Sequence, residues 1–222
     1  MAFRWNIFFT YLPILAQTSV VTFQVVGLSV LFSAVLGLGL AMLRMSKNKV
    51  VSGIARVYIE VIRGVPLLVQ ILWLFFGLTL LFGLDMEPVP AGVLNMTLWG
   101  CVYFAEIYRS GLSSIHRTQY YAGYSLGMSP FECFRRVILP QAFRKIVPPF
   151  ISQVIVMTKS SSLLSVINVQ EITKRADTMS VALYAPFEIY LACGVVYFVI
   201  LFTIAQLGKL AEKKLRVNLL EG

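Results

Sequence analysis

The sequence predicts an all-α integral membrane protein with about five transmembrane helices. Hydrophobic residues make up 58% of the 222 residues, 13% are charged, and the mean hydropathy is +0.80, which is too apolar for a soluble globular domain. Several long runs contain no charged residue at all. Because a helix needs about 20 apolar residues to cross a hydrocarbon core of about 30 Å, each such run is a candidate span.

The expected spans cover residues 18–43, 57–84, 92–110, 146–168 and 187–208. The first charge-free run, 5–43, is too long for one crossing. Pro13 and several aromatic residues lie in its early part, so residues 1–17 are predicted to form an interfacial segment ahead of a transmembrane domain over 18–208. A cleaved signal peptide is the alternative, but the first six residues lack its basic cluster.

Positive charges orient the chain, because cytoplasmic loops of membrane proteins are enriched in Lys and Arg. Five spans would place three basic clusters on one side: Arg44, Lys47, Lys49 and Arg56; Arg109, Arg117, Arg135, Arg136, Arg144 and Lys145; and Lys209, Lys213, Lys214 and Arg216. The N-terminus is then outside, and residues 209–222 are a cytoplasmic tail. The net charge of +9 reflects this topology and contact with the lipid bilayer, and we expect no nucleic-acid partner.

No catalytic or metal-binding pattern is found. Cys101, Cys133 and Cys193 are widely separated, and His116 has no cysteine or carboxylate at ligand spacing. The phosphate-binding pattern G-x-x-x-x-G-K-[ST] is absent as well. We therefore expect no metal site, no cofactor bound by this chain and no enzyme activity of its own.

The polar insert "YYAGYSLGMSPFECFRRVILPQA" (120–142) is predicted to form two helices joined by a sharp turn. Thr118 is a candidate N-cap for the first helix, and Gly127 suits its left-handed end. In "SPFE", Ser129 and Glu132 form a capping box with a proline at the first helical position. Pro140 is expected to stop the second helix.

The insert is also rich in aromatic residues for a solvated loop, and two arginines accompany them. Two interpretations remain open from the residues alone: a surface for a protein partner, or packing against the chain's own spans and the lipid headgroups. The aromatic residues are Tyr120, Tyr121, Tyr124, Phe131 and Phe134.

The pattern A-x-x-x-x-G-x9-[IV]-x-L-P, which begins at Ala122, resembles the cytoplasmic "EAA" loop of permease subunits of binding-protein-dependent ABC importers. Further segments resemble the polar amino-acid uptake permeases of the histidine/glutamine/arginine type: "IEVIRGVPLLVQ" (59–70), "AEIYRSG" (105–111), "KSSSLLSVI" (159–167) and "PFEIYLACGVVYF" (186–198). The resemblance implies the type I importer permease fold, with the EAA coupling loop at 111–145.

In that family the loop docks on the ATP-binding subunit. The resemblance therefore implies coupling residues at Tyr121, Ala122, Gly123, Leu126, Gly127, Ser129, Phe131, Arg135, Arg136, Leu139 and Pro140. One departure is that Tyr121 stands where the family usually has the glutamate, which could close a capping box with Thr118. Gly123 likewise replaces the second alanine.

Lys159 is the one charge in the fourth expected span, and Ser160, Ser161 and Ser162 follow it. An ionisable residue within a span usually faces a cavity or a partner, and a polar run is typical of a bent helix that lines one. The alternative is a structural ion pair with Glu60 or Glu106. In relatives an acidic or amide residue often follows this lysine.

Three further substrate-pathway candidates lie in neighbouring spans. Trp99 and Tyr103 share a helical face at i and i+4, although such a pair more often packs. Gln70 places an amide in apolar surroundings, where it needs a partner. Glu60, Arg63 and Glu106 are gate or ion-pair candidates, with Arg63 able to pair with either carboxylate.

The sequence thus predicts a permease subunit in the bacterial cytoplasmic membrane that imports a polar amino acid. Its expected partners are two ABC ATPase subunits carrying ATP and Mg²⁺, a second permease subunit, identical or related, and an extracytoplasmic amino-acid-binding protein. The alternative is an autonomous channel or an ion-coupled secondary carrier for small polar solutes.

Overall fold

The computed structural model describes the backbone of residues 3–217 and the side chains of residues 3–214, and every regular element in that range is a helix. In chain order the elements are α1 (Trp5–Arg44), α2 (Lys49–Gly64), α3 (Leu67–Phe82), α4 (Pro88–Ser113), α5 (Arg117–Ser125), α6 (Pro130–Cys133), the π-helix η1 (Phe134–Ile138), α7 (Leu139–Ser160), the 3₁₀-helix η2 (Ser161–Ile167), α8 (Ile172–Ala182) and α9 (Pro186–Val217).

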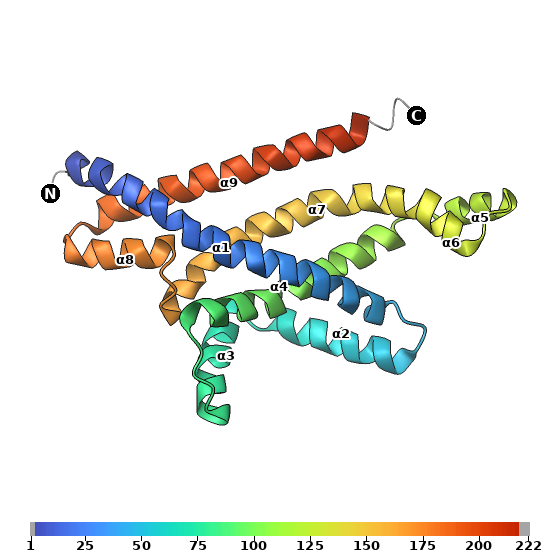
Figure 1. The fold of residues 1–222 in the computed structure, drawn as a ribbon, viewed down its shortest axis with the longest axis horizontal. Coiled ribbons are helices and arrows are strands. Elements are labelled where there is room, and N and C mark those ends of the chain that lie inside the picture. The colour runs from blue at the N-terminus through green and yellow to red at the C-terminus, as the bar shows by residue number, and fades with distance from the viewer. Residues whose placement is uncertain (1–2, 218–222) are drawn as a thin grey trace.

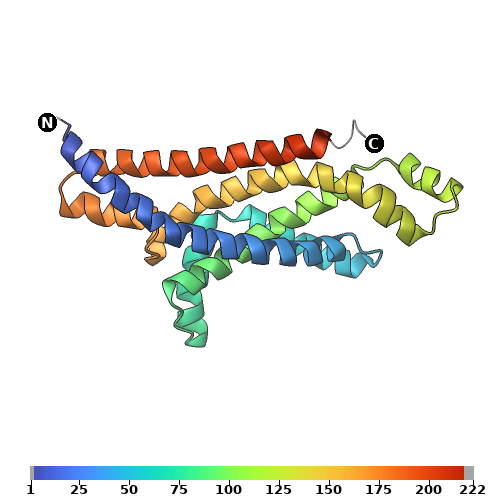
Figure 2. The same ribbon diagram turned by 45° about the horizontal axis from the view of Figure 1, so that its top comes forward.

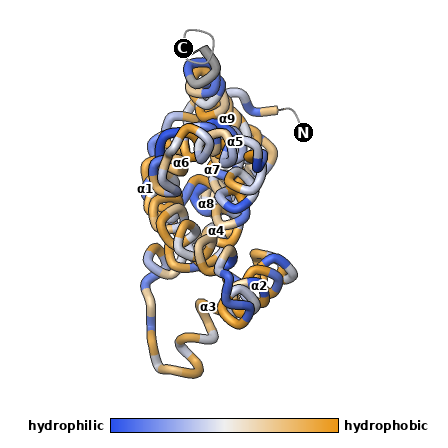
Figure 3. The backbone as a smooth tube through the Cα atoms, turned by 90° about the vertical axis from the view of Figure 1, so that its right-hand side faces the viewer, coloured by the Kyte–Doolittle hydropathy of each residue, from blue (hydrophilic) through white to orange (hydrophobic). Residues whose placement is uncertain are grey.

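Four long helices, α1, α4, α7 and α9, run lengthwise and build the body of the molecule (Figures 1 and 2). The short helices α5 and α6 lie at one end, near the turn between α1 and α2, and α8 lies at the other end, near the N-terminus. Viewed along the bundle, the long helices are largely hydrophobic and α2 lies outside their stack (Figure 3). α4 is the central element, since it packs against α1 on one side and α7 on another.

Small residues allow α1 and α4 to approach closely. Ser29, Ser33, Gly37 and Ala41 recur every fourth residue along α1, and all four are buried. The Ser33 hydroxyl donates a hydrogen bond to the Thr97 carbonyl at 3.1 Å. Such stripes let helices in lipid gain dispersion contacts and interhelical hydrogen bonds, which replace the hydrophobic driving force available in water.

The first helix starts earlier than the expected span. α1 begins at Trp5 and continues without a break through Pro13 to Arg44, a length of about 60 Å at 1.5 Å per residue. Its start is held by Arg4, whose backbone N–H and Nε both donate to Glu188 Oε1, at 3.1 and 3.3 Å. The interfacial location of residues 1–17 stays a prediction, and residues 1–2 lie outside the described part of the chain.

The prediction of a single helix over 57–84 is wrong, because the chain breaks there into α2 and α3. The helix axis bends by 104° at the break. Val65 is extended (φ −103°, ψ 133°), as the residue before a proline prefers, and Pro66 cannot continue the hydrogen-bond ladder. The amide of Gln70 satisfies the carbonyls freed by the break: its Nε2 donates to Ile62 O at 2.7 Å and to Val65 O at 2.8 Å.

By length and mean hydropathy, three of the described helical segments could cross a membrane: Trp5–Arg44, Pro130–Ile167 and Pro186–Lys214. The pair α2 and α3 gives a fourth if it is counted as one bent span. α4 falls outside this set although it has 26 residues. Because α4 is buried among the other helices along much of its length, it needs less apolar surface than a helix facing lipid.

Candidate functional site: coupling loop and polar cavity

The predicted cap of the first loop helix is wrong. α5 starts at Arg117, and its N-cap is His116, whose Nδ1 accepts a hydrogen bond from the Thr118 N–H at 3.3 Å. The third helical position is therefore Gln119, and Tyr121 lies two residues beyond it. A glutamate at position 121 could not close a capping box here, so the helix start does not account for the difference between tyrosine and glutamate.

The turn after α5 has the predicted geometry. Gly127 adopts φ +76°, and two hydrogen bonds close a Schellman motif: Gly127 N–H to Tyr124 O at 3.0 Å and Met128 N–H to Gly123 O at 3.1 Å. The capping box of α6 is confirmed too, because the Glu132 N–H donates to Ser129 Oγ and the Ser129 N–H donates to Glu132 Oε2.

Pro140 does not stop the second helix, contrary to the prediction. The helix widens into the π-helical turn Phe134–Ile138 and continues as α7 to Ser160. Pro140 occupies the first turn of α7, and the preceding N–H of Leu139 bonds to Phe134 O, five residues back. A π-turn of this kind removes the need for the N–H that proline lacks, so the loop passes into a long helix without a break.

The replacement of alanine by Gly123 also has a structural reason. A Cβ atom built on Gly123 would lie 2.5 Å from Cys133 Sγ, and Cys133 is fully buried between the two loop helices. Glycine at position 123 therefore leaves the space that the Cys133 thiol fills.

The loop helices leave an apolar surface uncovered within the chain. Leu126 is 78% exposed, Phe131 70% and Tyr121 61%, and Arg135 and Arg136 are exposed as well. These side chains thus favour the partner-surface interpretation over packing on the chain's own helices.

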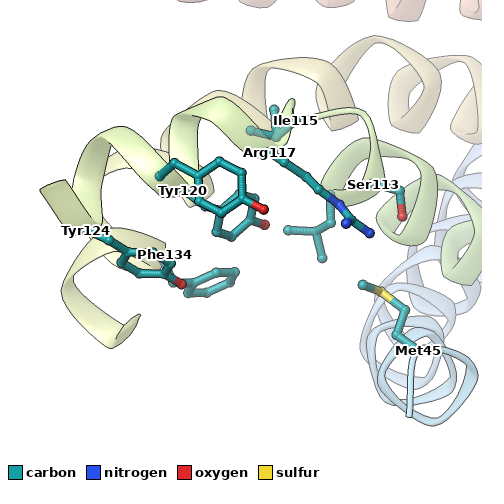
Figure 4. A pocket seen from close by; sticks show the side chains of 9 residues that line it. Met45, Ser113, Ile115, Arg117, Tyr120, Tyr124 and Phe134 are labelled. Atoms are coloured by element: carbon teal, nitrogen blue, oxygen red, sulfur yellow. The ribbon is translucent and has the colours of Figure 1, made fainter. Parts of the chain in front are cut away.

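A hollow of about 570 Å³ opens beside α5. Tyr120, Tyr124 and Phe134 lie along one part of it, and Arg117 reaches across toward Met45 at the end of α1 (Figure 4). An aromatic hollow next to exposed hydrophobic side chains suits the insertion of a partner's side chains.

A second cavity, of about 480 Å³ and widely open at the surface of the chain, is bordered by α2, α4 and α7 and brings three predicted residues together, Arg63, Tyr103 and Glu106. The Arg63 guanidinium carbon lies 5.9 Å from the centroid of the Tyr103 ring. The expected ion pair of Arg63 with Glu60 or Glu106 is not formed. Glu106 binds Arg109 instead, at 2.8 Å, and in the described chain the other ion pair is Arg4–Glu188.

The remaining pathway candidates lie elsewhere. Trp99 is buried and packs on Tyr103, with ring centroids 4.8 Å apart. Gln70 borders a separate apolar hollow of about 420 Å³ inside the α2–α3 corner. Lys159 is exposed near the end of α7, where the helix tightens to 3₁₀ geometry over Ser161–Ile167. That the polar run lines a cavity stays a prediction.

The serines after Lys159 bond to their own helix. Ser161 donates to Thr158 O and Ser162 to Lys159 O, both at 2.8 Å, and Ser160 is half-buried at the end of α7. The proposed alternative of a Lys159 ion pair with Glu60 or Glu106 is not formed among the described residues.

Residues 33–217 match the family model described as "Binding-protein-dependent transport system inner membrane component". The chain belongs to this family. The permease is 35% identical to the L-cystine transport system permease protein TcyL of Bacillus subtilis (98% of this chain, 93% of TcyL). It is 32% identical to the glutamine transport system permease protein GlnP of Escherichia coli K12 (98% and 100%).

Solved structures agree with this assignment. The permease superposes on a chain of the "amino acid ABC transporter with histidines" with a TM-score of 0.90 at 35% identity, covering 96% of this chain and all of the other. It superposes on the MetNI methionine ABC transporter in an inward-facing form with a TM-score of 0.74 at 15% identity, covering 90% and 95%, which supports the fold.

One cavity residue of the permease was missed by the sequence reasoning. Gln153 on α7 is 7% exposed, lines the same cavity as Arg63, and its Nε2 has no hydrogen-bond partner. The signal that singled out Gln70, an amide in an apolar run, was present at Gln153 as well. Only the fold shows that the two amides differ, because Gln70 is satisfied by backbone carbonyls and Gln153 is not.

Proposed function

We propose that this permease forms half of the pore of an ATP-driven importer for a polar amino acid. The observation that carries the proposal is the exposed coupling loop, a capped two-helix unit joined through the π-turn directly to the long helix α7. The identities to permeases named for cystine, glutamine and arginine transport support an amino acid as the transported solute.

The proposed topology has five crossings, made by α1, the bent pair α2–α3, α4, α7 and α9. Support comes from the arrangement of the chain: the α1–α2 turn, the loop helices and the C-terminal end of α9 lie toward one end of the bundle (Figure 1). The three basic clusters gather there, so we assign that end to the cytoplasm and the N-terminus to the outside. Residues 1–17 are then the interfacial segment and 209–222 the cytoplasmic tail, of which 218–222 lie outside the described part.

The proposed assembly contains a second permease subunit, identical or related, because one chain supplies only one wall of a pore. Two ATPase subunits, which hold ATP and Mg²⁺, would dock on the two coupling loops. An extracytoplasmic binding protein would deliver the amino acid to the segments around Asp85–Pro90 and Glu171–Pro186. The assembly would reside in the bacterial inner membrane.

In the proposed mechanism, movement of the ATPase subunits is transmitted mechanically through the loop helices to α7. When the two ATPases close around nucleotide, the docked loop helices move, and α7 transmits this displacement toward the cavity that it lines with Gln153. ATP binding would open the pore outward and hydrolysis would reset it. In this scheme the coupling surface is the exposed apolar patch with Arg135 and Arg136.

The proposed pathway follows from the cavity. Arg63, Tyr103 and Glu106 border it, whereas Lys159 and the serines after it lie at the far end of α7, where we keep them as contacts for solute entering from outside. Glu60 is exposed on α2 and stays a gate candidate. Trp99 and Gln70 have structural contacts that account for their positions.

The test is Gly127→Asp. Gly127 has φ +76° and open space around it, so the substitution strains the turn and adds an acidic group without a clash inside the loop. We expect substrate-stimulated ATPase activity to be abolished while the protein remains in the membrane. An unchanged transport rate would contradict the assignment.

The autonomous carrier is distinguished by co-purification in detergent. A stoichiometric ATPase that leaves the permease when Phe131 and Leu126 are both replaced by serine supports the importer. Solute uptake by the permease alone, in vesicles without ATPase, would favour the carrier.

A further inference from the structure

A buried carboxylate lies at the end of the bundle opposite the coupling loop, beyond the end of α7. The chain leaves α7 through the 3₁₀-helix η2, turns at Asn168 (φ +65°) and enters α8 directly after Glu171. Glu171 is 1% exposed, which is rare for a glutamate that has no ion pair. Neither ion pair of the described residues includes it. Hydrogen bonds must therefore satisfy this carboxylate.

Both oxygens of the Glu171 carboxylate accept hydrogen bonds. Oε1 accepts from the Lys174 N–H at 2.7 Å, and Oε2 accepts from the Thr173 N–H at 2.9 Å and from the Tyr197 hydroxyl at 2.7 Å. A tyrosine has a single O–H, so the Thr173 hydroxyl is the donor in its 3.1 Å bond to the Tyr197 oxygen. One side chain thus caps the start of α8 and also binds α9.

The cap alone does not account for this arrangement. The two N–H groups at the start of α8 are satisfied by the carboxylate whether or not Tyr197 is bound. Burial raises the pKa of the Glu171 carboxyl above its ordinary value, although its hydrogen bonds act in the opposite direction. The charged form therefore costs free energy in this position, which an exposed N-cap residue would avoid.

A second tyrosine of α9 binds α8 nearer to the surface. The Tyr190 hydroxyl donates to Asp177 Oδ1 at 3.2 Å, and both residues are exposed. Tyr190 and Tyr197 are seven residues apart and so lie on the same face of α9. Because water competes for the exposed bond and not for the buried one, the Glu171–Tyr197 bond is the stronger link between the two helices.

The position of Glu171 relates this link to transport. α7 begins at the coupling loop, and its other end continues through η2 to Glu171. In the proposed topology α8 lies on the outer side, next to α9 and near the N-terminus (Figure 1).

We propose that Glu171 is a positioning residue for transport, which binds Tyr197 so that α8 and the outer part of α9 follow α7 as one unit. Without this bond, a displacement of α7 bends the joint at Asn168 and does not reach α8. The inference rests on the proposed function. It adds the residue through which movement of the coupling loop reaches the surface where the binding protein delivers the solute.

The test compares two tyrosine-to-phenylalanine substitutions on α9. Tyr197→Phe removes the hydroxyl that binds Glu171 and keeps both cap hydrogen bonds, whereas Tyr190→Phe removes the hydroxyl that binds Asp177 and is the matched control. The permease–ATPase complex is reconstituted in proteoliposomes. Its ATPase activity is measured without the binding protein and with the binding protein loaded with L-cystine, L-glutamine or L-arginine.

We expect Tyr197→Phe to lower the stimulation by loaded binding protein about tenfold, as for the loss of one hydrogen bond to a charged group. Basal ATPase activity and the half-saturating concentration of binding protein should not change, because the outer surface of α8 is intact. Tyr190→Phe should leave all three quantities unchanged. A double variant with Glu171→Ala should be no worse than Glu171→Ala alone, since the two side chains act through one bond.

Amide hydrogen exchange separates positioning from capping. Thr173 and Lys174 should keep their protection in Tyr197→Phe and lose it in Glu171→Ala. If Tyr197→Phe lost this protection as fully as Glu171→Ala does, the hydroxyl would serve the stability of α8, and the positioning role would be wrong.

Two further results overturn the proposal in different ways. If loaded binding protein stimulates the unmodified complex and Tyr197→Phe equally, Glu171 does not transmit the movement, and the importer function stands. If the unmodified complex is neither stimulated nor able to transport any of the three amino acids, the proposed function fails together with the inference.

Discussion

The coupling loop and the α2–α3 corner both reverse or bend the chain sharply next to a proline, and they satisfy the freed backbone groups by different means. In the loop, Gly127 takes a left-handed conformation and the neighbouring backbone closes its own hydrogen bonds. At the corner, Val65 stays extended and the side chain of Gln70 binds the two freed carbonyls from a turn further along.

The difference follows from the surroundings. The loop is exposed, so water can complete any hydrogen bond that its backbone leaves open. Residues 63–66 at the corner are also exposed on the surface of the chain. In the proposed topology that surface lies in the membrane, where an unsatisfied carbonyl has no water to bind and a polar side chain must supply the donor. In that topology the corner depends on one side chain, whereas the loop turn is distributed over several backbone bonds.

The strongest way to test this contrast is Gln70→Leu. The substitution keeps the apolar contacts of the side chain and leaves Ile62 O and Val65 O without a donor, so we expect a loss of about 2 kcal/mol in the free energy of unfolding. Thermal unfolding of the purified permease measures it. Gln24→Leu, an exposed amide-to-leucine change on α1, serves as the control, and equal midpoints for the two variants would show that the corner does not depend on Gln70.

A smaller effect is expected from Gly123→Ala in the loop. The added methyl would meet the Cys133 thiol, so we expect overpacking of about 1 kcal/mol, faster amide hydrogen exchange in α5 and weaker substrate-stimulated ATPase activity. The double variant with Cys133→Ala frees the space. It should recover the exchange protection, because alanine also favours the helix.

No recovery in the double variant would mean that position 123 acts through the ATPase contact and not through the spacing of the loop helices. Cys133→Ala alone is the companion measurement, since it removes the thiol without adding the methyl.

Features encoded within a few residues were predictable, and features that depend on distant segments were not. The Gly127 turn and the Ser129–Glu132 capping box were read correctly because each is complete within one short stretch. The cap at His116 was missed since Thr118 was the more usual cap residue, and the π-turn before Pro140 has no short sequence signature.

The corner at Pro66 is a local feature that the sequence prediction did not give. Gly64 and Pro66 indicate a break, but the charge-free run has the length of one span and favours a single helix. Hydropathy reports that a segment is apolar and not whether it is straight. The cavity was only half predictable for a related reason: Arg63, Tyr103 and Glu106 could be named singly, whereas their meeting with Gln153 depends on how α2, α4 and α7 pack.

The smallest expected effect is a pH dependence of the loop turn. The backbone N–H and the hydroxyl of Ser129 both donate to the Glu132 carboxylate, and these bonds hold the pKa of Glu132 below its ordinary value. Because the folded pKa is the lower one, this contribution to stability is fully present above the ordinary carboxyl pKa of about 4.3 and is lost as the pH falls through the lowered value.

Hydrogen exchange at the start of α6, followed from pH 6 down to well below the ordinary carboxyl pKa, should therefore show a loss of protection relative to Glu132→Gln, whose amide does not titrate. The α2–α3 corner has no titrating group among its Gln70 contacts, so its protection should not follow the same dependence. If both bends lost protection in parallel, a general acid effect would explain the change, and the contrast between a backbone-closed turn and a side-chain-held corner would lose its electrostatic support.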